Sequence, residues 1–358
     1  MITVSLCMIV KNEAEVLARC LESAAGLVDE IILVDTGSTD GTKEIAARFT
    51  DRIYEFAWED DFAAARNYAF SLAEMDSCLW LDADDVLLPP DQKLFRTLKE
   101  TLSPTTSVVM AKYNTGFDDA GNVVFSYYRE RLIKNRAGFR WKGAVHEVIE
   151  PAGEIVYADF AVTHRKIRAS DPDRNLRIYE KLLAQGATLE PRQQFYYGRE
   201  LFDHGRYAEA QEVFAAFLAE GRGWRENNID ACRLQSLCLE RLNQSEKAVS
   251  ALLQSFVYDR PRAEICCELG RWFFTREDYQ TAAYWYTSAL LCPRNDKTGA
   301  FTLPDCYGYL PCLQLCVCYS RLGDQDRAEH LNELAASFKP DAPEVLHNRA
   351  WFENRKSV

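Results

Sequence analysis

The chain has 358 residues, a length for which two domains are the natural expectation. Hydrophobic residues make up 47% of the composition and charged residues 27%, as in ordinary globular proteins rather than disordered or fibrous ones. The net charge of −12 would repel a polyanion such as DNA or RNA, so no nucleic-acid partner is expected.

The chain is expected to be cytoplasmic and without a transmembrane segment. No basic segment precedes the first apolar run, and no small-residue cleavage site follows it, so we do not expect a signal peptide. No stretch reaches the ~18 apolar residues of a membrane helix. The twelve cysteines do not form metal-type pairs, and disulfides are rare without a secretion signal. We expect these cysteines to be small buried residues in packed helices.

The first 165 residues alternate between short apolar runs and helical stretches. The run at 4–10 is continuously apolar, as is typical of a parallel strand buried on both faces. This alternation predicts a mostly parallel sheet with right-handed crossovers. The predicted helices are about 14–25, 42–49 and 63–73. The predicted strands are 4–10, 30–35, 52–56, 78–81, 108–113, 123–132 and 155–163.

From about residue 170 the strands give way to helical segments that repeat. Four small residues each precede an alanine by 12 positions, and the repeats start 38, 34 and 46 residues apart. These positions resemble tetratricopeptide repeats, whose period is about 34 residues. Small residues let the two helices of a hairpin approach closely, and the long last gap indicates an insertion at 294–305. The pairs are Gly198 and Ala210, Ser236 and Ala248, Gly270 and Ala282, and Cys316 and Ala328.

Carboxylates follow two of the predicted strands. Asp35 closes the second strand, and Asp82, Asp84 and Asp85 follow the fourth. Ligands of open parallel sheets bind beyond the C-terminal strand ends. Because three carboxylates within four residues repel one another, a divalent cation that prefers oxygen ligands would explain the cluster. The alternative is that Asp85 and its neighbours cap a helix that begins near Pro89.

Several common cofactor and catalytic motifs are missing from the sequence. No glycine-rich dinucleotide motif follows the first strand, which argues against a dehydrogenase. The sequence also contains neither a phosphate-binding loop ending in Gly-Lys-Ser/Thr nor a Gly-x-Ser-x-Gly nucleophile elbow of a hydrolase. A cation at the strand ends therefore remains the leading interpretation.

Four segments, in this order, resemble the family 2 glycosyltransferases with the GT-A fold. They read VSLCMIVKNE at 4–13, ILVDTGSTDGT at 32–42, AARN at 64–67 and LWLDADD at 79–85. The resemblance implies an inverting transfer from a nucleotide diphosphate sugar, usually with Mn²⁺ or Mg²⁺. We therefore predict an α/β GT-A nucleotide-sugar-binding domain at 1–165, a helical linker at 166–190 and an all-α tetratricopeptide-like solenoid at 191–358.

The resemblance also implies roles for residues around the donor nucleotide. Asp35 would bind the nucleobase, and Ser38 and Asp40 would lie in the loop that follows it. Arg66 would reach the diphosphate or the base, and Glu13 would help to shape the nucleotide pocket. The alternatives are that Ser38 and Asp40 are only turn or cap residues, and that Arg66 is a solvated charge on a helix.

The reacting end of the site has its own candidates. Asp82 and Asp84 match the family's Asp-x-Asp motif, which holds the ribose and the metal. Because the usual Glu-Asp motif of the catalytic base is not obvious, Glu147 is our candidate for the base. His164 follows the last strand of the domain, where GT-A enzymes often supply a third metal ligand. The alternative for His164 is a hydrogen-bonded interface histidine.

The arrangement of a family 2 domain followed by tetratricopeptide-like repeats is similar to that of the sublancin-type peptide S-glycosyltransferases. It implies a UDP-hexose donor, with UDP-glucose the leading candidate, and a peptide or protein acceptor modified at Cys or Ser. Two alternatives stay open. One is an enzyme of envelope polysaccharide or lipid-linked saccharide synthesis, and the other is a repeat scaffold with an inactive transferase domain. The acidic charge balance does not forbid a homo-oligomer.

Overall fold

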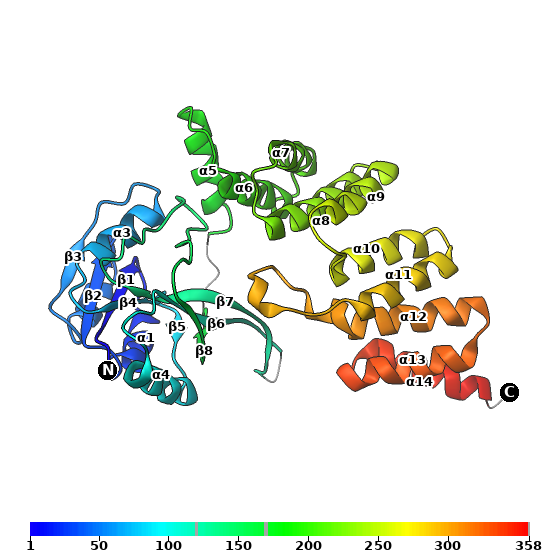
Figure 1. Cartoon of the computed structure of the whole chain (residues 1–358), viewed down its shortest axis with the longest axis horizontal. Coiled ribbons are helices and arrows are strands. Elements are labelled where there is room, and N and C mark those ends of the chain that lie inside the picture. The colour runs from blue at the N-terminus through cyan, green and yellow to red at the C-terminus, as the bar shows by residue number, and fades with distance from the viewer. Residues whose placement is uncertain (119–120, 168–170, 357–358) are drawn as a thin grey trace. The chain divides into compact units, whose positions relative to one another are not determined.

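The computed structural model describes residues 1–118, 121–167 and 171–356. The chain divides into two compact units, Met1–Thr188 and Leu189–Val358 (Figure 1). The first unit is α/β and the second is all-α, which confirms the predicted fold class. The segment expected to be a linker, 166–190, contains helix α5, Arg174–Ala184, and its residues up to Thr188 belong to the first unit.

One eight-stranded sheet organises the first unit, in the order β3-β2-β1-β4-β7-β6-β8-β5. The pairs within β3-β2-β1-β4 are parallel, whereas β7 runs antiparallel to both of its neighbours. β8 pairs parallel with β6 and antiparallel with β5, so the sheet is mixed. The strands are β1 Val4–Val10, β2 Glu30–Asp35, β3 Ile53–Glu55, β4 Ser77–Trp80, β5 Asp85–Val86, β6 Val108–Phe117, β7 Val123–Lys134 and β8 Ile155–His164.

Helices cover both faces of the parallel part of the sheet, which explains its continuous apolar runs. On one face, Leu6 and Leu33 belong to a core that includes residues of α1 and α4. On the other face, Cys7 and Ile32 pack with Ala69 of α3. Successive residues of β1 thus enter opposite cores, as the period of a strand requires. The helices are α1 Leu17–Ala24, α2 Thr42–Ala46, α3 Phe62–Ser71 and α4 Pro89–Thr101.

Strand β5 is the main element that the sequence pattern did not predict. It has only two residues, and its Asp85 lies opposite His164 of β8. Asp85 is fully buried in this strand. The N-cap of α4 is Leu88, which makes no side-chain cap bond. The interpretation of Asp85 as a helix cap is therefore wrong, because the residue lies in the sheet.

The described part of the second unit, 189–356, contains four helical hairpins and a final helix. α6 packs on α7, α8 on α9, α10 on α11 and α12 on α13. The four repeat alanines are fully buried, and a Cβ placed on Gly198 or Gly270 would lie within 3.0 Å of a facing aromatic ring. Close approach of the two helices thus explains the small residues of each repeat. The helices are α6 Pro191–Asp203, α7 Tyr207–Glu220, α8 Arg225–Arg241, α9 Ser245–Gln254, α10 Ala263–Phe274, α11 Tyr279–Leu291, α12 Tyr309–Leu322, α13 Gln325–Phe338 and α14 Pro343–Lys356.

The expected burial of the cysteines is confirmed for all of them except Cys292. Cys7 and Cys78 lie in strands β1 and β4, so the expectation that the cysteines lie in packed helices is wrong for these two. Among the helices that the structure describes, none is long and apolar enough to cross a membrane.

Candidate active site

A pocket of about 610 Å³ lies in the first unit, beyond the C-terminal ends of β1 and β4. The loop after β1 supplies Lys11 to Glu13, and the loop after β4 supplies Asp82 and Asp84. His164, at the end of β8, and Glu147 also line it. Asp82, Asp84, Glu147 and His164 therefore share one cavity beyond the strand ends, whereas Asp35 does not line it.

Arg66 of α3 joins two of the acidic groups. Its Nη2 donates to Asp82 Oδ1 and its Nε donates to Glu147 Oε1, both at 2.7 Å. The guanidinium lies over the rings of Trp80 and Trp141, at 4.8 and 5.0 Å from their centroids. These contacts hold a buried, planar cation between two carboxylates. Arg66 is thus a paired residue of the pocket and not a solvated helix charge.

Arg66 and Asp82 change each other's pKa values. Burial alone would lower the pKa of Arg66, but the charges of Asp82 and Glu147 raise it. Burial alone would raise the pKa of Asp82, but the positive charges of Arg66 and Arg131 lower it to about 2. Asp82 therefore stays ionised and Arg66 stays charged at neutral pH.

The loop that carries Glu147 is closed by backbone and side-chain hydrogen bonds. Lys142 and Val148 exchange backbone bonds of 2.9 and 3.1 Å, which makes 142–148 a closed loop. Asn67 forms a reciprocal pair with the Trp141 backbone, at 3.0 and 2.9 Å. The Arg66-Asn67 dipeptide of the AARN segment therefore has two functions: Arg66 contacts Glu147, and Asn67 fixes the loop that presents it.

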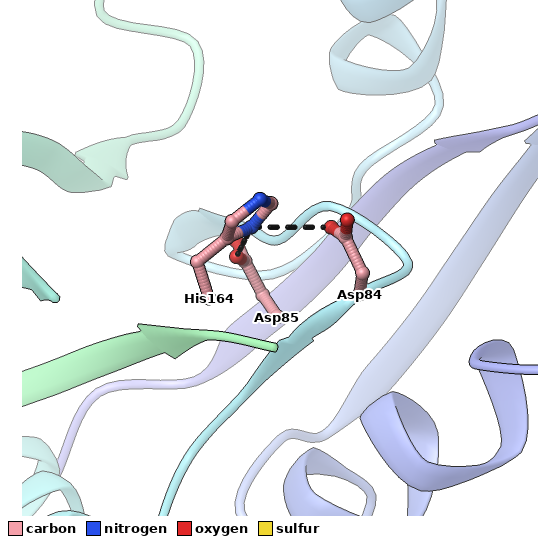
Figure 2. Close-up of side chains that lie close together, drawn as sticks. All are labelled: Asp84, Asp85 and His164. Atoms are coloured by element: carbon pink, nitrogen blue, oxygen red, sulfur yellow. Dashed lines mark hydrogen bonds and ion pairs between the residues drawn. The ribbon is translucent and has the colours of Figure 1, made fainter. Parts of the chain in front are cut away.

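Asp84, Asp85 and His164 form a second cluster (Figure 2). His164 Nδ1 lies 3.3 Å from Asp84 Oδ1 and 3.2 Å from Asp85 Oδ1. The side chains of Asp84 and His164 are 23% and 25% exposed, whereas Asp85 is completely buried. Asp84 and His164 line the pocket, and Asp85 lies behind them.

Both carboxylate oxygens of Asp85 already have partners other than Asp84. Its Oδ2 pairs with Arg131 Nη1 at 3.1 Å, and neither side chain is exposed. Its Oδ1 accepts the Tyr113 hydroxyl at 2.9 Å. Arg131 in turn lies 3.8 Å from the Trp80 ring centroid. We therefore assign Asp85 to orienting the cluster, because its oxygens already hold a cation and a hydroxyl.

Burial and the neighbouring charges shift the pKa values of Asp84 and His164. Burial raises the pKa of Asp84, and His164 opposes this shift while Asp82 and Asp85 add to it. Burial would lower the pKa of His164, but Asp85 and Asp84 raise it. A nearby cation would relieve the repulsion among these acids, as a proton on His164 does.

The donor atoms fit a divalent cation. The three residues offer ligand atoms that all lie within 4.8 Å of one another. Two carboxylates and an imidazole suit Mn²⁺, and the partly exposed Asp84 and His164 are the two that would hold it. Asp82, the other predicted ligand, is paired with Arg66 and lies outside this cluster. Its role as a ligand stays a prediction.

Asp35 is buried at the end of β2 and retains an unused acceptor. Its Oδ1 accepts the backbone N–H groups of Gly37 and Ser38, both at 2.9 Å. Its Oδ2 is shielded from solvent and has no hydrogen-bond partner among the described residues. Buried acceptors are normally bonded, so this atom is suited to a donor on a ligand such as the N–H of a nucleobase.

Ser38 and Asp40 support the neighbouring loop. Ser38 Oγ accepts the Asn12 N–H at 2.9 Å, and Asp40 Oδ2 accepts the Ala14 N–H at 3.2 Å. Neither residue lines the pocket, whereas Glu13 does. These bonds favour the structural alternative for Ser38 and Asp40, because both side chains are used to position the 11–14 loop.

The sequence interpretation did not assign several residues that the pocket requires. Trp58 lines the pocket and packs edge-on against Phe62, with centroids 4.7 Å apart. Arg131 and Tyr113 hold Asp85, as described above. Arg131, next to the apolar Leu132 and Ile133 of strand β7, was an available signal for such a partner, because arginine is rarely fully buried without an acid.

Residues 5–152 match the model of the glycosyl transferase family 2. Within the first unit, residues 5–152 are therefore similar to the family 2 glycosyltransferases. This finding agrees with the acids at the strand ends and with the AARN and LWLDADD segments.

Three similar curated proteins share parts of this chain. A TPR repeat-containing protein of Synechococcus elongatus is 39% identical over 42% of this chain and 36% of its own length. The prophage-derived glycosyltransferase SunS of Bacillus subtilis is 26% identical over 56% of this chain and 49% of its own. The lipopolysaccharide core biosynthesis glycosyltransferase LpsC of Rhizobium meliloti is 29% identical over 40% and 56%. The matched part of the chain thus spans from about a third to just over half of the length of these relatives.

Proposed function

We propose that this chain transfers a hexose from a UDP-sugar, with inversion, to a nucleophile on a peptide or protein. The observation that carries the proposal is the pocket in which Asp84 and His164 lie together with the Arg66-linked Asp82 and Glu147. A family 2 domain in residues 5–152 supports the same chemistry.

The donor half of the proposal rests on Asp35, Asp84 and His164. Asp35 Oδ2 would accept a nucleobase N–H, and Asp84 with His164 would hold Mn²⁺ or Mg²⁺. When bound, the cation would neutralise charge that develops on the leaving diphosphate, an effect of several kcal/mol. Asp82 would contact the ribose with the carboxylate that Arg66 orients.

Glu147 is the proposed base. It lines the pocket, and Arg66 holds its Oε1 in place at 2.7 Å. A positioned carboxylate would accept the proton of the acceptor as the acceptor attacks the sugar. A cysteine acceptor would depend less on this base, because part of a thiol is already thiolate near neutral pH.

The acceptor is proposed from the second unit and from the resemblance to the sublancin-type peptide S-glycosyltransferases. A stack of helical hairpins offers an extended surface for a polypeptide. The similarity to LpsC favours a saccharide acceptor as the second candidate. A purely structural role of the first unit is disfavoured, because Asp84, His164 and Glu147 all line one open pocket.

The test is release of nucleoside diphosphate from a panel of UDP- and other nucleotide sugars, with and without EDTA. Acceptors are a cysteine peptide, its serine counterpart and a core oligosaccharide. We expect UDP release that EDTA abolishes and added Mn²⁺ restores, together with a peptide whose mass increases by one hexose. Sugar transfer to the oligosaccharide alone would select the second candidate, and no transfer from any donor would refute both.

A further inference from the structure

Cysteines of one apolar core surround the insertion between α11 and α12. Cys266 and Cys267 are consecutive residues of α10, and they share this core with Cys292 and Cys306. Cys292 caps the C-terminal end of α11, and Cys306 lies in a short 3-10 turn before α12. The insertion expected at 294–305 lies between these two helices, so a cysteine of the core stands near each of its ends.

Cys266 and Cys292 form a contacting pair. Their thiols share a hydrogen bond, and Cys292 Sγ also lies 3.3 Å from the carbonyl oxygen of Pro261, just before α10 begins. The contact arises because the end of α11 lies beside the start of α10 in their hairpin. A disulfide bond is ~2.05 Å long, so the two sulfurs would have to approach further to form one. Cys292 can supply this movement, because it lies outside the helix with an extended backbone.

The two members of this pair differ in their access to solvent and in their acidity. Cys292 is partly exposed, whereas Cys266 is completely buried. The hydrogen bond from Cys266 lowers the pKa of Cys292; burial and Glu264 oppose this shift, and Arg262 and Arg260 add to it. The same hydrogen bond raises the pKa of Cys266, and burial raises it further. Because the thiolate is the reactive form, Cys292 is the member that an oxidant in solvent would meet and react with first.

We infer that Cys266 and Cys292 are a redox modification site, at which a peroxide oxidises Cys292 and Cys266 then closes a reversible disulfide. In the first step the Cys292 sulfur attacks one oxygen of hydrogen peroxide, and the O–O bond breaks. The leaving oxygen takes up the thiol proton and departs as water, so Cys292 is oxidised to a sulfenic acid and the peroxide is reduced.

The second step forms the disulfide. The Cys266 sulfur attacks the Cys292 sulfur, and the S–O bond of the sulfenic acid breaks. The hydroxyl group departs as a second water with the proton of Cys266. Two thiols and one peroxide thus give one disulfide and two waters, and a dithiol reductant reverses the change. This chemistry does not depend on sugar transfer.

A second thiol pair of the same core provides an internal comparison. Cys267 shares a hydrogen bond with Cys306, and its Sγ lies 3.8 Å from the Cys306 carbonyl oxygen. Both residues are buried, each with 5% of its surface exposed. Since a sulfenic acid forms at an accessible thiolate, we expect this second pair to stay reduced under conditions that oxidise Cys292. Selectivity for one of the two pairs is therefore part of the inference.

The experiment treats the full, reduced chain with hydrogen peroxide and then blocks the remaining thiols with N-ethylmaleimide in denaturant. Tryptic peptides are mapped by mass spectrometry without reduction. Trypsin places Cys266 and Cys267 in 263–271, Cys292 in 277–294 and Cys306 in 298–321.

We expect a disulfide between peptides 263–271 and 277–294 that dithiothreitol reverses, in chains that remain unlinked to one another on a denaturing, non-reducing gel. The inference is overturned if Cys292 stays fully alkylated or is oxidised without forming this link. A link from 263–271 to 298–321 in its place, or a link between two chains, would overturn it as well. This arm uses the unmodified chain, so its result does not depend on the folding of any variant.

Variants separate the roles of the two thiols. Cys267→Ser should retain the link, whereas Cys266→Ser should remove it and leave Cys292 as a sulfenic acid that dimedone traps. Cys292→Ser should abolish both the link and the dimedone label. Cys312→Ser is the matched control, because it removes a fully buried thiol of a different core, and it should change neither readout. If Cys266→Ser, folded by circular dichroism, still links 263–271 to 277–294, the assignment of Cys266 is wrong.

Discussion

At the scale of single residues, Asp84 is the carboxylate that most directly tests the proposed metal site. It lies in the pocket beside His164, whereas Asp85 is tied to Arg131 and Tyr113. Asp84→Ala should leave His164 as the one member of the cluster that can reach a cation in the pocket. We expect turnover to fall by about 100-fold or more, since a cation supplies several kcal/mol.

The measurement pairs Mn²⁺ titration by calorimetry with UDP release. Asp51→Ala, which removes an exposed carboxylate from the same unit, is the matched control and should change neither quantity. Near-normal turnover of the Asp84 variant at matched Mn²⁺ would show that the metal assignment is wrong.

Asp35 should act on donor binding more than on chemistry. Its unused Oδ2 is the acceptor that a nucleobase N–H would fill, and it lies at the end of β2, which β1 separates from β4 and the Asp84 loop. Asp35→Ala should therefore raise the KM for the donor by about tenfold or more, with a smaller effect on kcat. UDP binding measured by calorimetry gives the same comparison without catalysis, and an unchanged UDP affinity would contradict the assignment.

The Asp85–Arg131 pair predicts a large effect on stability. Neither side chain is exposed, so Arg131→Met leaves a buried carboxylate without its cation. Such a loss costs about 3–5 kcal/mol, whereas the double variant Asp85→Asn with Arg131→Met should recover part of it. Urea unfolding followed by tryptophan fluorescence measures both.

Arg48→Met is the control for the Arg131 variant, because Arg48 is exposed. We expect its effect to stay within about 0.5 kcal/mol, as for ordinary surface changes. Equal stability of the Arg131 and Arg48 variants would mean that the buried pair does not stabilise the first unit.

At the scale of elements, close packing of α10 on α11 sets the repeat geometry. A Cβ on Gly270 would lie 2.8 Å from the buried Tyr286 ring. Alanine favours a helix over glycine by about 1 kcal/mol, yet Gly270→Ala should destabilise the second unit by about 1–3 kcal/mol through overpacking. Thermal unfolding followed by circular dichroism checks the sign.

Tyr286→Leu provides the matched background for this test. With the ring removed, Gly270→Ala should cost less or even stabilise, because the clash no longer opposes the gain in helix propensity. An equal cost in both backgrounds would show that the contact with Tyr286 is not the reason for the glycine.

At the scale of the whole molecule, the two compact units predict a separable function. Residues 1–188 contain the pocket and its sheet, so a chain ending at Thr188 should still bind Mn²⁺ and UDP. It should lose most transfer to a polypeptide acceptor, because the hairpin stack that would hold the acceptor is gone. The assays are calorimetry for the ligands and mass spectrometry for the acceptor.

Two outcomes distinguish the roles of the second unit. If the shortened chain is folded and modifies the acceptor at the full rate, acceptor binding by the repeats is refuted. If it unfolds by circular dichroism and binds neither ligand, the repeats are instead required for the stability of the first unit.

The sequence by itself determined the features that depend on neighbouring residues. Apolar runs identified β1, β2 and β4, and the acids that follow them, Asp35 and Asp84, were recognised as candidate site residues. The 12-residue spacing from a small residue to alanine identified the hairpins. Each of these signals is a local period, which the chain carries whatever its tertiary contacts.

Only the tertiary structure decided which of these side chains meet. Asp85 reaches His164 through a pairing of β5 with β8 that spans 79 residues, and a two-residue strand has no period to reveal it. Arg66 reaches Glu147 across 81 residues, through a loop fixed by Asn67. The contact of Phe301 with Arg199 likewise depends on how the hairpins stack. Partners so distant in sequence are chosen by packing and burial, which no local pattern encodes.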